Sequence, residues 1–132
     1  MAKLEISTDG QFKHHCGGSL ISKTFVLTAA HCLENINVDR LRLLLGTNDV
    51  SQDQVYLQER KVLRAFTHPE YDTTKVYYDV ALLQMNAGVT FNAGIHPVCL
   101  PEEASEDVDL RRNDLVTLTG WGTATRSDEN AR

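Results

Sequence analysis

Two residues of this sequence have the side-chain types and the surroundings that acid–base chemistry requires. His31 ends the run VLTAAH and stands directly before Cys32. Asp79 opens the apolar run DVALL, and a carboxylate at the edge of a buried strand is costly unless it is hydrogen-bonded or paired. An imidazole N–H would satisfy that carboxylate, which would in turn hold the imidazole in one tautomer and stabilise its protonated form. The two residues therefore predict a His–Asp pair in which His31 is the general base.

Each of these residues also has a structural interpretation. A single histidine is often a hydrogen-bonded structural residue, and Asp79 could instead cap a strand edge. Asp72 is a competing acid nearby, but it lies among threonines and a tyrosine in a predicted loop. His14 and His15 are adjacent on a predicted strand, so their side chains point to opposite faces and cannot readily share a metal ion. We therefore favour the pairing of His31 with Asp79.

The three cysteines, Cys16, Cys32 and Cys99, allow one internal disulfide and leave one thiol over. In a secreted protein, an odd cysteine indicates either a bond to another chain or a free thiol. Structural zinc is the competing interpretation. It is not favoured, because the sequence has no Cys-x-x-Cys pair and because adjacent ligands such as His31 and Cys32 give poor tetrahedral spacing.

The elements that must position these residues have the pattern of β-strands. The leucines at 41, 43 and 45 recur with the period of two that gives a strand one buried face, and no long segment repeats at the helical period. Turn signals such as Asp9-Gly10 separate the short apolar runs. Strands are predicted at residues 12–15, 19–22, 25–28, 41–45, 55–66, 80–85 and 116–118. About seven antiparallel strands predict an all-β domain, either a barrel or a sandwich.

Length and charge limit the possible functions. A chain of 132 residues with 42% apolar residues is sufficient for one domain. Its net charge of −5 and the absence of a run of Lys or Arg argue against a nucleic-acid partner. No stretch approaches the roughly 18 to 20 apolar residues of a membrane helix, so no membrane partner is expected. The first five residues lack the features of a signal peptide, and the acidic segment 101–107 is expected to be an exposed connector.

Five motifs in a fixed order resemble those of the chymotrypsin and trypsin family of serine endopeptidases. They are CGGSLI, LTAAHC, YDVALL, HPVCLP and TGWGT, and together they extend over residues 12–125. The resemblance implies a six- to seven-stranded antiparallel β-barrel, the first of the two barrels of a secreted trypsin-like protease. Residues 1–119 would form this barrel. Residues 120–132 would begin the segment that leads to the second barrel, and we expect that segment to be mobile.

The resemblance also assigns roles to individual residues. His31 would be the general base and then the general acid, Asp79 would orient and stabilise it, and Cys16 and Cys32 would form a disulfide. Cys99 matches a cysteine that bonds to the activation or regulatory chain in many multi-chain relatives. No cofactor and no metal ion is implied. The loop 46–56 binds calcium in some relatives, but here it offers only the carboxylates of residues 49 and 53, so calcium is not favoured.

Three parts of the family pattern are missing from these 132 residues. The Ile-Val-Gly-Gly type of mature start is absent, and so is the Asp-Ser-Gly segment that carries the nucleophile. Val116 stands where many relatives have a cysteine that bridges to the second barrel. The serines at 19, 22, 51, 105 and 127 have neither a Gly-x-Ser-x-Gly nor an Asp-Ser-Gly setting.

We therefore expect the N-terminal half of a zymogen-type serine endopeptidase that cleaves proteins. The chain would be inactive alone and would depend on a C-terminal half that supplies the serine. The alternative is a non-catalytic protease homologue that acts as a binding or regulatory module. A third hypothesis is a truncated or proteolytically released barrel, whose exposed apolar surface would cause it to self-associate.

Overall fold

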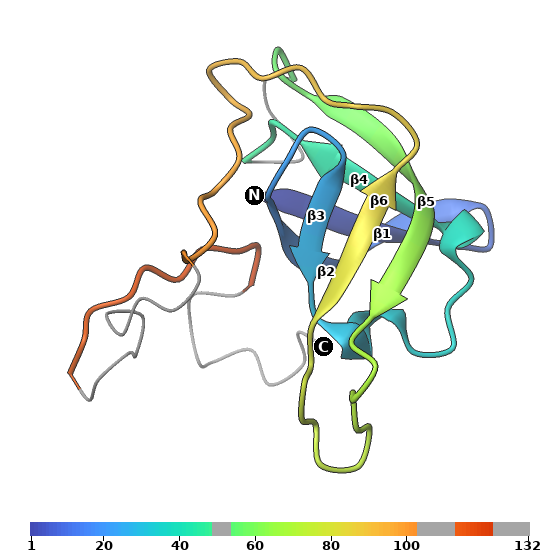
Figure 1. Ribbon diagram of the computed structural model, residues 1–132. Helices are drawn as coiled ribbons and strands as arrows, with labels where there is room; N and C mark the ends of the chain where they lie inside the picture. The colour runs from blue at the N-terminus through green and yellow to red at the C-terminus, as the bar shows by residue number, and fades with distance from the viewer. Residues whose placement is uncertain (49–53, 103–112, 123–132) are drawn as a thin grey trace, which may run out of the picture.

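The computed structural model describes residues 1–48, 54–102 and 113–122. Six antiparallel strands close into one barrel in the spatial order β1-β2-β3-β6-β5-β4, which confirms the all-β prediction (Figure 1). The strands are β1 (Ala2–Thr8), β2 (Gln11–Leu20), β3 (Phe25–Thr28), β4 (Leu41–Leu45), β5 (Gln58–Thr67) and β6 (Ala81–Met85). Two short 3₁₀-helices, η1 (Ala30–Leu33) and η2 (Val38–Arg40), lie between β3 and β4.

The core lies inside the barrel and is built from alternate residues of its strands. In β4 the three leucines of the predicted alternation are fully buried. In β6 the residues Ala81, Leu83 and Met85 are buried, while Leu82 and Gln84 lie on the outer face. This period of two is what a strand with one apolar face requires.

The first strand was not predicted. β1 pairs with both β2 and β4 and so closes the barrel. It is joined to β2 by the predicted Asp9-Gly10 turn, in which both residues have positive φ. Its charged residues concealed it, because Lys3 and Glu5 give the segment a polar appearance. The two residues are only 5% and 4% exposed, and their side chains form an ion pair of 3.0 Å that satisfies both charges.

Three other strand predictions were wrong in part, and a fourth was wrong altogether. The separate strands predicted at 12–15 and 19–22 are one continuous strand, β2, and residues 55–56 form a turn before β5. No strand forms at 116–118, where Val116 and Leu118 are 68% and 96% exposed. The reason is topological: six strands already close the barrel, so no free edge remains to pair with a seventh.

Gly18 lies where β2 leaves its pairing with β1 and begins to pair with β3. A Cβ atom at Gly18 would lie 2.6 Å from Cγ1 of Val26 and 2.9 Å from the carbonyl oxygen of Leu27. The neighbouring Gly17 has no such restriction, because its nearest contact would be 3.9 Å away. Gly18 therefore permits the close approach of two strands that the barrel corner needs.

In the described part of the chain, no helix has both the length and the apolar character needed to cross a membrane. Several predictions lie outside the described residues: the calcium carboxylates at 49 and 53, most of the acidic connector, and the tail after residue 122. The division between residues 119 and 120 stays a prediction.

Candidate active site

The pairing of β3 with β6 brings the two predicted acid–base residues together. Thr28, at the end of β3, lies opposite Ala81, at the start of β6. His31 follows three residues after Thr28, on the 3₁₀-turn η1, and Asp79 precedes Ala81 by two residues. Residues 48 positions apart in the sequence therefore meet at one end of the barrel, where η1 and the β5–β6 loop lie near each other (Figure 1).

Asp79 contacts His31 through both of its carboxylate oxygens. The backbone N–H of His31 donates to Oδ1 at 2.8 Å, and Nδ1 of the His31 ring lies 2.6 Å from Oδ2. The His31 side chain is 58% exposed and that of Asp79 is 22% exposed. The remaining ring nitrogen, Nε2, makes one long contact of 3.7 Å with Sγ of Cys32. The carboxylate is thus held between the strand ends, while most of the imidazole is accessible.

The protonation of the pair follows from the hydrogen bonds of Asp79. The backbone N–H of His31, and after it the imidazole, holds the pKa of Asp79 below its ordinary value of 3.8, although burial acts in the opposite direction. An ionised carboxylate can only accept hydrogen bonds, so the proton of a neutral His31 ring lies on Nδ1. Nε2 then carries the lone pair, which is the arrangement of a general base.

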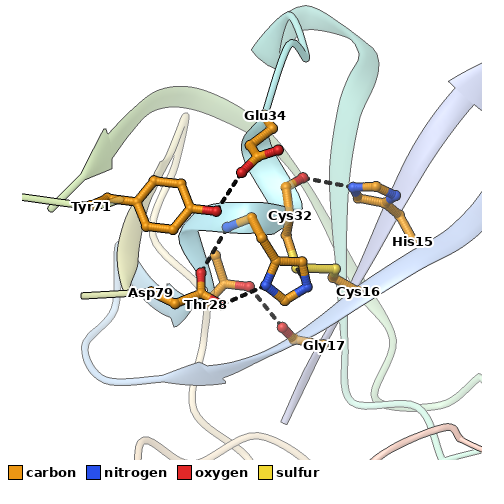
Figure 2. Close-up of polar contacts among 9 residues, drawn as sticks. His15, Cys16, Gly17, Thr28, Cys32, Glu34, Tyr71 and Asp79 are labelled. Atoms are coloured by element: carbon orange, nitrogen blue, oxygen red, sulfur yellow. Dashed lines mark hydrogen bonds and ion pairs between the residues drawn. A yellow bond between two sulfur atoms is a disulfide. The ribbon is translucent and has the colours of Figure 1, made fainter. Parts of the chain in front are cut away.

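A disulfide fixes the backbone on the other side of His31. Cys16 in β2 is bonded to Cys32 in η1 across a sequence separation of 16 residues. Nε2 of His15 lies 2.6 Å from the carbonyl oxygen of Cys32, and Thr28 Oγ1 donates to the carbonyl of Gly17 at 2.8 Å (Figure 2). The turn that presents the imidazole is therefore anchored to β2 by one covalent bond and by polar contacts.

The ligand atoms of Cys16, His31 and Cys32 lie within 4.8 Å of one another, as a metal site would require. The disulfide occupies both sulfurs, so this cluster offers no thiolate ligand. Cys99, the third cysteine, is an exposed free thiol. The structure thus pairs the first two cysteines and leaves the third accessible.

Asp72, the competing acid, has a different role. Its Oδ1 accepts hydrogen bonds from the backbone N–H groups of Thr74 at 2.8 Å and Lys75 at 3.0 Å. These bonds stabilise a turn of the β5–β6 loop. The structure therefore brings Asp79, and not Asp72, to His31.

One contact beside the pair was missed at the sequence level. The hydroxyl of Tyr71, in the β5–β6 loop, donates a hydrogen bond to Oε1 of Glu34, at the end of η1 (Figure 2). The partners lie 37 residues apart. No short motif or periodicity links such positions, so only the fold could identify them.

Two hollows lie on the surface beside the pair. A cleft of about 610 Å³ is lined by Asp79, by Gly17 and Gly18 of β2, and by the segment that contains Gly120 and Trp121. An adjacent apolar groove of about 440 Å³ lies on the outer face of the barrel. Its lining includes Leu27, Phe66, Val80, Leu82 and Leu100. Leu27 and Val80 line both hollows, so together they form one continuous surface.

The structure thus places a His–Asp pair at one end of a closed antiparallel barrel. Comparison with known proteins gives the family. The family model of trypsin matches residues 1–132. The chain belongs to the trypsin family and corresponds to the N-terminal half of its protease domain. This confirms the resemblance seen in the motifs.

Several curated proteins are similar to the chain. Limulus clotting factor C of Carcinoscorpius rotundicauda is 35% identical over 81% of this chain and 11% of its own length. Serine proteinase stubble of Drosophila melanogaster is 34% identical over 83% of this chain and 14% of its own length. Ovochymase-2 of Mus musculus is 36% identical over 89% of this chain and 19% of its own length. The chain thus spans less than a fifth of the length of these relatives.

Proposed function

We propose that this chain supplies the histidine and the aspartate of a Ser-His-Asp triad in a secreted serine endopeptidase. The observation that carries the proposal is the double contact between Asp79 and His31, which leaves Nε2 as the basic nitrogen. Membership of the trypsin family supplies the reaction class, the hydrolysis of peptide bonds in protein substrates.

In this reaction His31 transfers two protons, one in acylation and one in deacylation. Nε2 takes the proton of a serine hydroxyl as the serine oxygen bonds to the carbonyl carbon of the substrate. The resulting imidazolium is stabilised by the carboxylate of Asp79 and then gives the proton to the leaving amine as the peptide bond breaks. Water then attacks the acyl-enzyme. His31 takes a proton from this water and gives it to the serine oxygen as the bond between the serine and the acyl group breaks.

The serine would come from a C-terminal half that docks beside the pair. None of the six serines in the sequence, Ser7 included, has a Gly-x-Ser-x-Gly or Asp-Ser-Gly setting, so the 132-residue chain alone is expected to be inactive. The cleft beside Asp79 supports a docking position there, because it is bounded by Gly120 and Trp121, which match the family's start of the second barrel.

Secretion and a disulfide bond to another chain are part of the same proposal. A disulfide such as Cys16–Cys32 persists in oxidising compartments. In that environment the exposed thiol of Cys99 is available to bond with an activation or regulatory chain, as expected of a zymogen.

Mass spectrometry and active-site labelling of the native protein test the proposal. We expect intact mass measurements, before and after reduction, to detect a companion polypeptide with the Asp-Ser-Gly segment. A fluorophosphonate probe, which bonds covalently to activated serines, should label that polypeptide. His31→Ala should abolish labelling, whereas His96→Ala, at an exposed position, should not change it. A companion with another residue at the nucleophile position would instead identify a non-catalytic binding or regulatory module.

A further inference from the structure

The hydrogen bond between Tyr71 and Glu34 connects the two segments that carry the acid–base pair. Glu34 ends the η1 turn, and its backbone N–H donates to the carbonyl oxygen of His31. Tyr71 stands in the β5–β6 loop, which continues to Asp79, and its own N–H donates to the carbonyl of His68 near the end of β5. The side-chain bond therefore joins the loop before Asp79 to the turn that holds His31 (Figure 2).

The charges around Tyr71 favour the neutral phenol that donates this bond. The hydrogen bond to Glu34 raises the pKa of Tyr71 to about 12, and desolvation and the negative charges of Glu34, Asp79 and Asp72 add to the shift. The hydroxyl therefore remains a donor at every pH at which a protease operates. A carboxylate acceptor makes the bond stronger than one between neutral groups.

Such a connection is needed because both partners of the acid–base pair lie outside the strands. His31 is on a short 3₁₀-turn, and Asp79 lies in the β5–β6 loop, two residues before the start of β6. The disulfide anchors the His31 side to β2 and leaves the Asp79 side without a covalent link. A displacement of about 1 Å between catalytic groups is sufficient to slow a reaction substantially.

We propose that Tyr71 and Glu34 are positioning residues that hold the Asp79 loop against the His31 turn through their side-chain hydrogen bond. The inference rests on the proposed function for its effect on catalysis. The effect on the geometry of the pair can be measured without activity.

The test is a mutant cycle in the complete native protein, with its serine-bearing half present. Tyr71→Phe and Glu34→Ala each remove the bond, and each should lower kcat about tenfold while KM changes little. The double variant should be no slower than either single variant, because both remove the same interaction. Glu34→Gln retains an acceptor oxygen and should keep kcat within about twofold of the wild type.

Tyr77→Phe is the matched control, since it removes a phenol hydroxyl from an exposed side chain of the same loop and should also stay within about twofold. The second readout is the low-field NMR resonance of the proton between His31 Nδ1 and Asp79. It should shift or broaden in Tyr71→Phe and Glu34→Ala, and remain in Glu34→Gln. If one bond-breaking variant fails to fold, the other provides the same comparison.

An unchanged kcat together with an unchanged resonance in Tyr71→Phe would overturn the positioning role. Loss of kcat in Glu34→Gln equal to that in Glu34→Ala would overturn it as well, because charge and not the hydrogen bond would then matter. If the wild-type protein cleaves no peptide bond, the proposed function fails separately. The resonance then decides alone: a shift in Tyr71→Phe supports the positioning role and no shift contradicts it.

Discussion

At the scale of single residues, Asp79 satisfies the backbone and the side chain of the same histidine. Its Oδ1 accepts from the His31 backbone N–H and its Oδ2 faces the ring nitrogen Nδ1. Orientation and charge stabilisation thus depend on one carboxylate. A substitution at Asp79 therefore affects the position of the turn as well as the tautomer of the ring.

The substitution Asp79→Asn tests this dependence. The amide replaces one of the two accepting oxygens of Asp79 with an NH₂ donor, so one of the two hydrogen bonds with His31 is lost. We expect kcat of the proposed protease to fall roughly 10,000-fold. Asp72→Asn removes the same charge from the same loop without touching His31 and should leave kcat within about twofold. Equal losses in the two variants would contradict the assignment of Asp79.

Acid should weaken the pair in a defined direction. The folded state lowers the pKa of Asp79 below 3.8, so the stabilisation from the ionised carboxylate is complete above the unfolded value and is lost as the pH falls through the lower folded value. The side-chain carbonyl resonance of Asp79, followed by NMR, should therefore titrate below pH 3.8. A titration above 3.8 would show that burial outweighs the two hydrogen bonds.

The identities of the pair were accessible from sequence, whereas the contacts around it were not. An acid at the start of an apolar run and a histidine beside a cysteine are local signals, and the motifs made them specific. The bond between Tyr71 and Glu34 depends on how two loops pass each other. Loop geometry follows from strand pairing and has no periodicity, so sequence reasoning had no means of finding it.

At the scale of elements, the sequence predicted the strands in which one apolar face is buried. It failed for a strand whose charged residues are buried. β3, β4 and β6 show the expected alternation and lie close to their predicted positions. β1 was missed because an ion pair lets Lys3 and Glu5 be buried on its other face. The segment 116–118 has the alternation but no edge to join.

The corner of β2 provides a test of strand packing. Gly18→Ala would place a methyl group against Val26 and the Leu27 carbonyl, so we expect it to lower the free energy of unfolding by roughly 1 to 3 kcal/mol. Gly17→Ala, one position earlier, would make only an ordinary contact of 3.9 Å and should change it by less than about 0.5 kcal/mol. Urea denaturation of both variants provides the measurement. Equal effects would show that the corner does not need the close approach.

At the scale of the whole molecule, the outer face of the barrel carries a row of apolar side chains from three neighbouring strands. A surface that faces water would normally have polar side chains there. Leu82 of β6 pairs in register with Leu27 of β3 and with Phe66 of β5, and these three residues line the apolar groove. A contiguous apolar surface of this kind favours association. In the proposed protease, the second half would cover at least the part that is continuous with the cleft.

The 132-residue chain alone should therefore self-associate. Light scattering after size exclusion should give a mass above the 14.8 kDa of one chain. Phe66→Lys places a charge in the apolar row and should shift the population toward the monomer. Gln84→Lys, on the outer face of β6 but absent from the groove lining, is the control and should not. A monodisperse monomer of the unmodified chain would contradict the prediction.

The order of the strands also has a consequence in time. β3 pairs with β6 across a long separation in the sequence, because β4 and β5 lie between them in the chain. The β1–β2 hairpin closes across a two-residue turn and can form within about 1 to 10 μs, whereas contacts between distant segments form more slowly because a longer loop must be closed. We therefore expect His31 and Asp79, which lie 48 residues apart, to meet after the β1–β2 hairpin has formed. A chain in which β3 and β6 have not paired contains both residues and no His–Asp contact, so the proposed acid–base site depends on this one strand pairing.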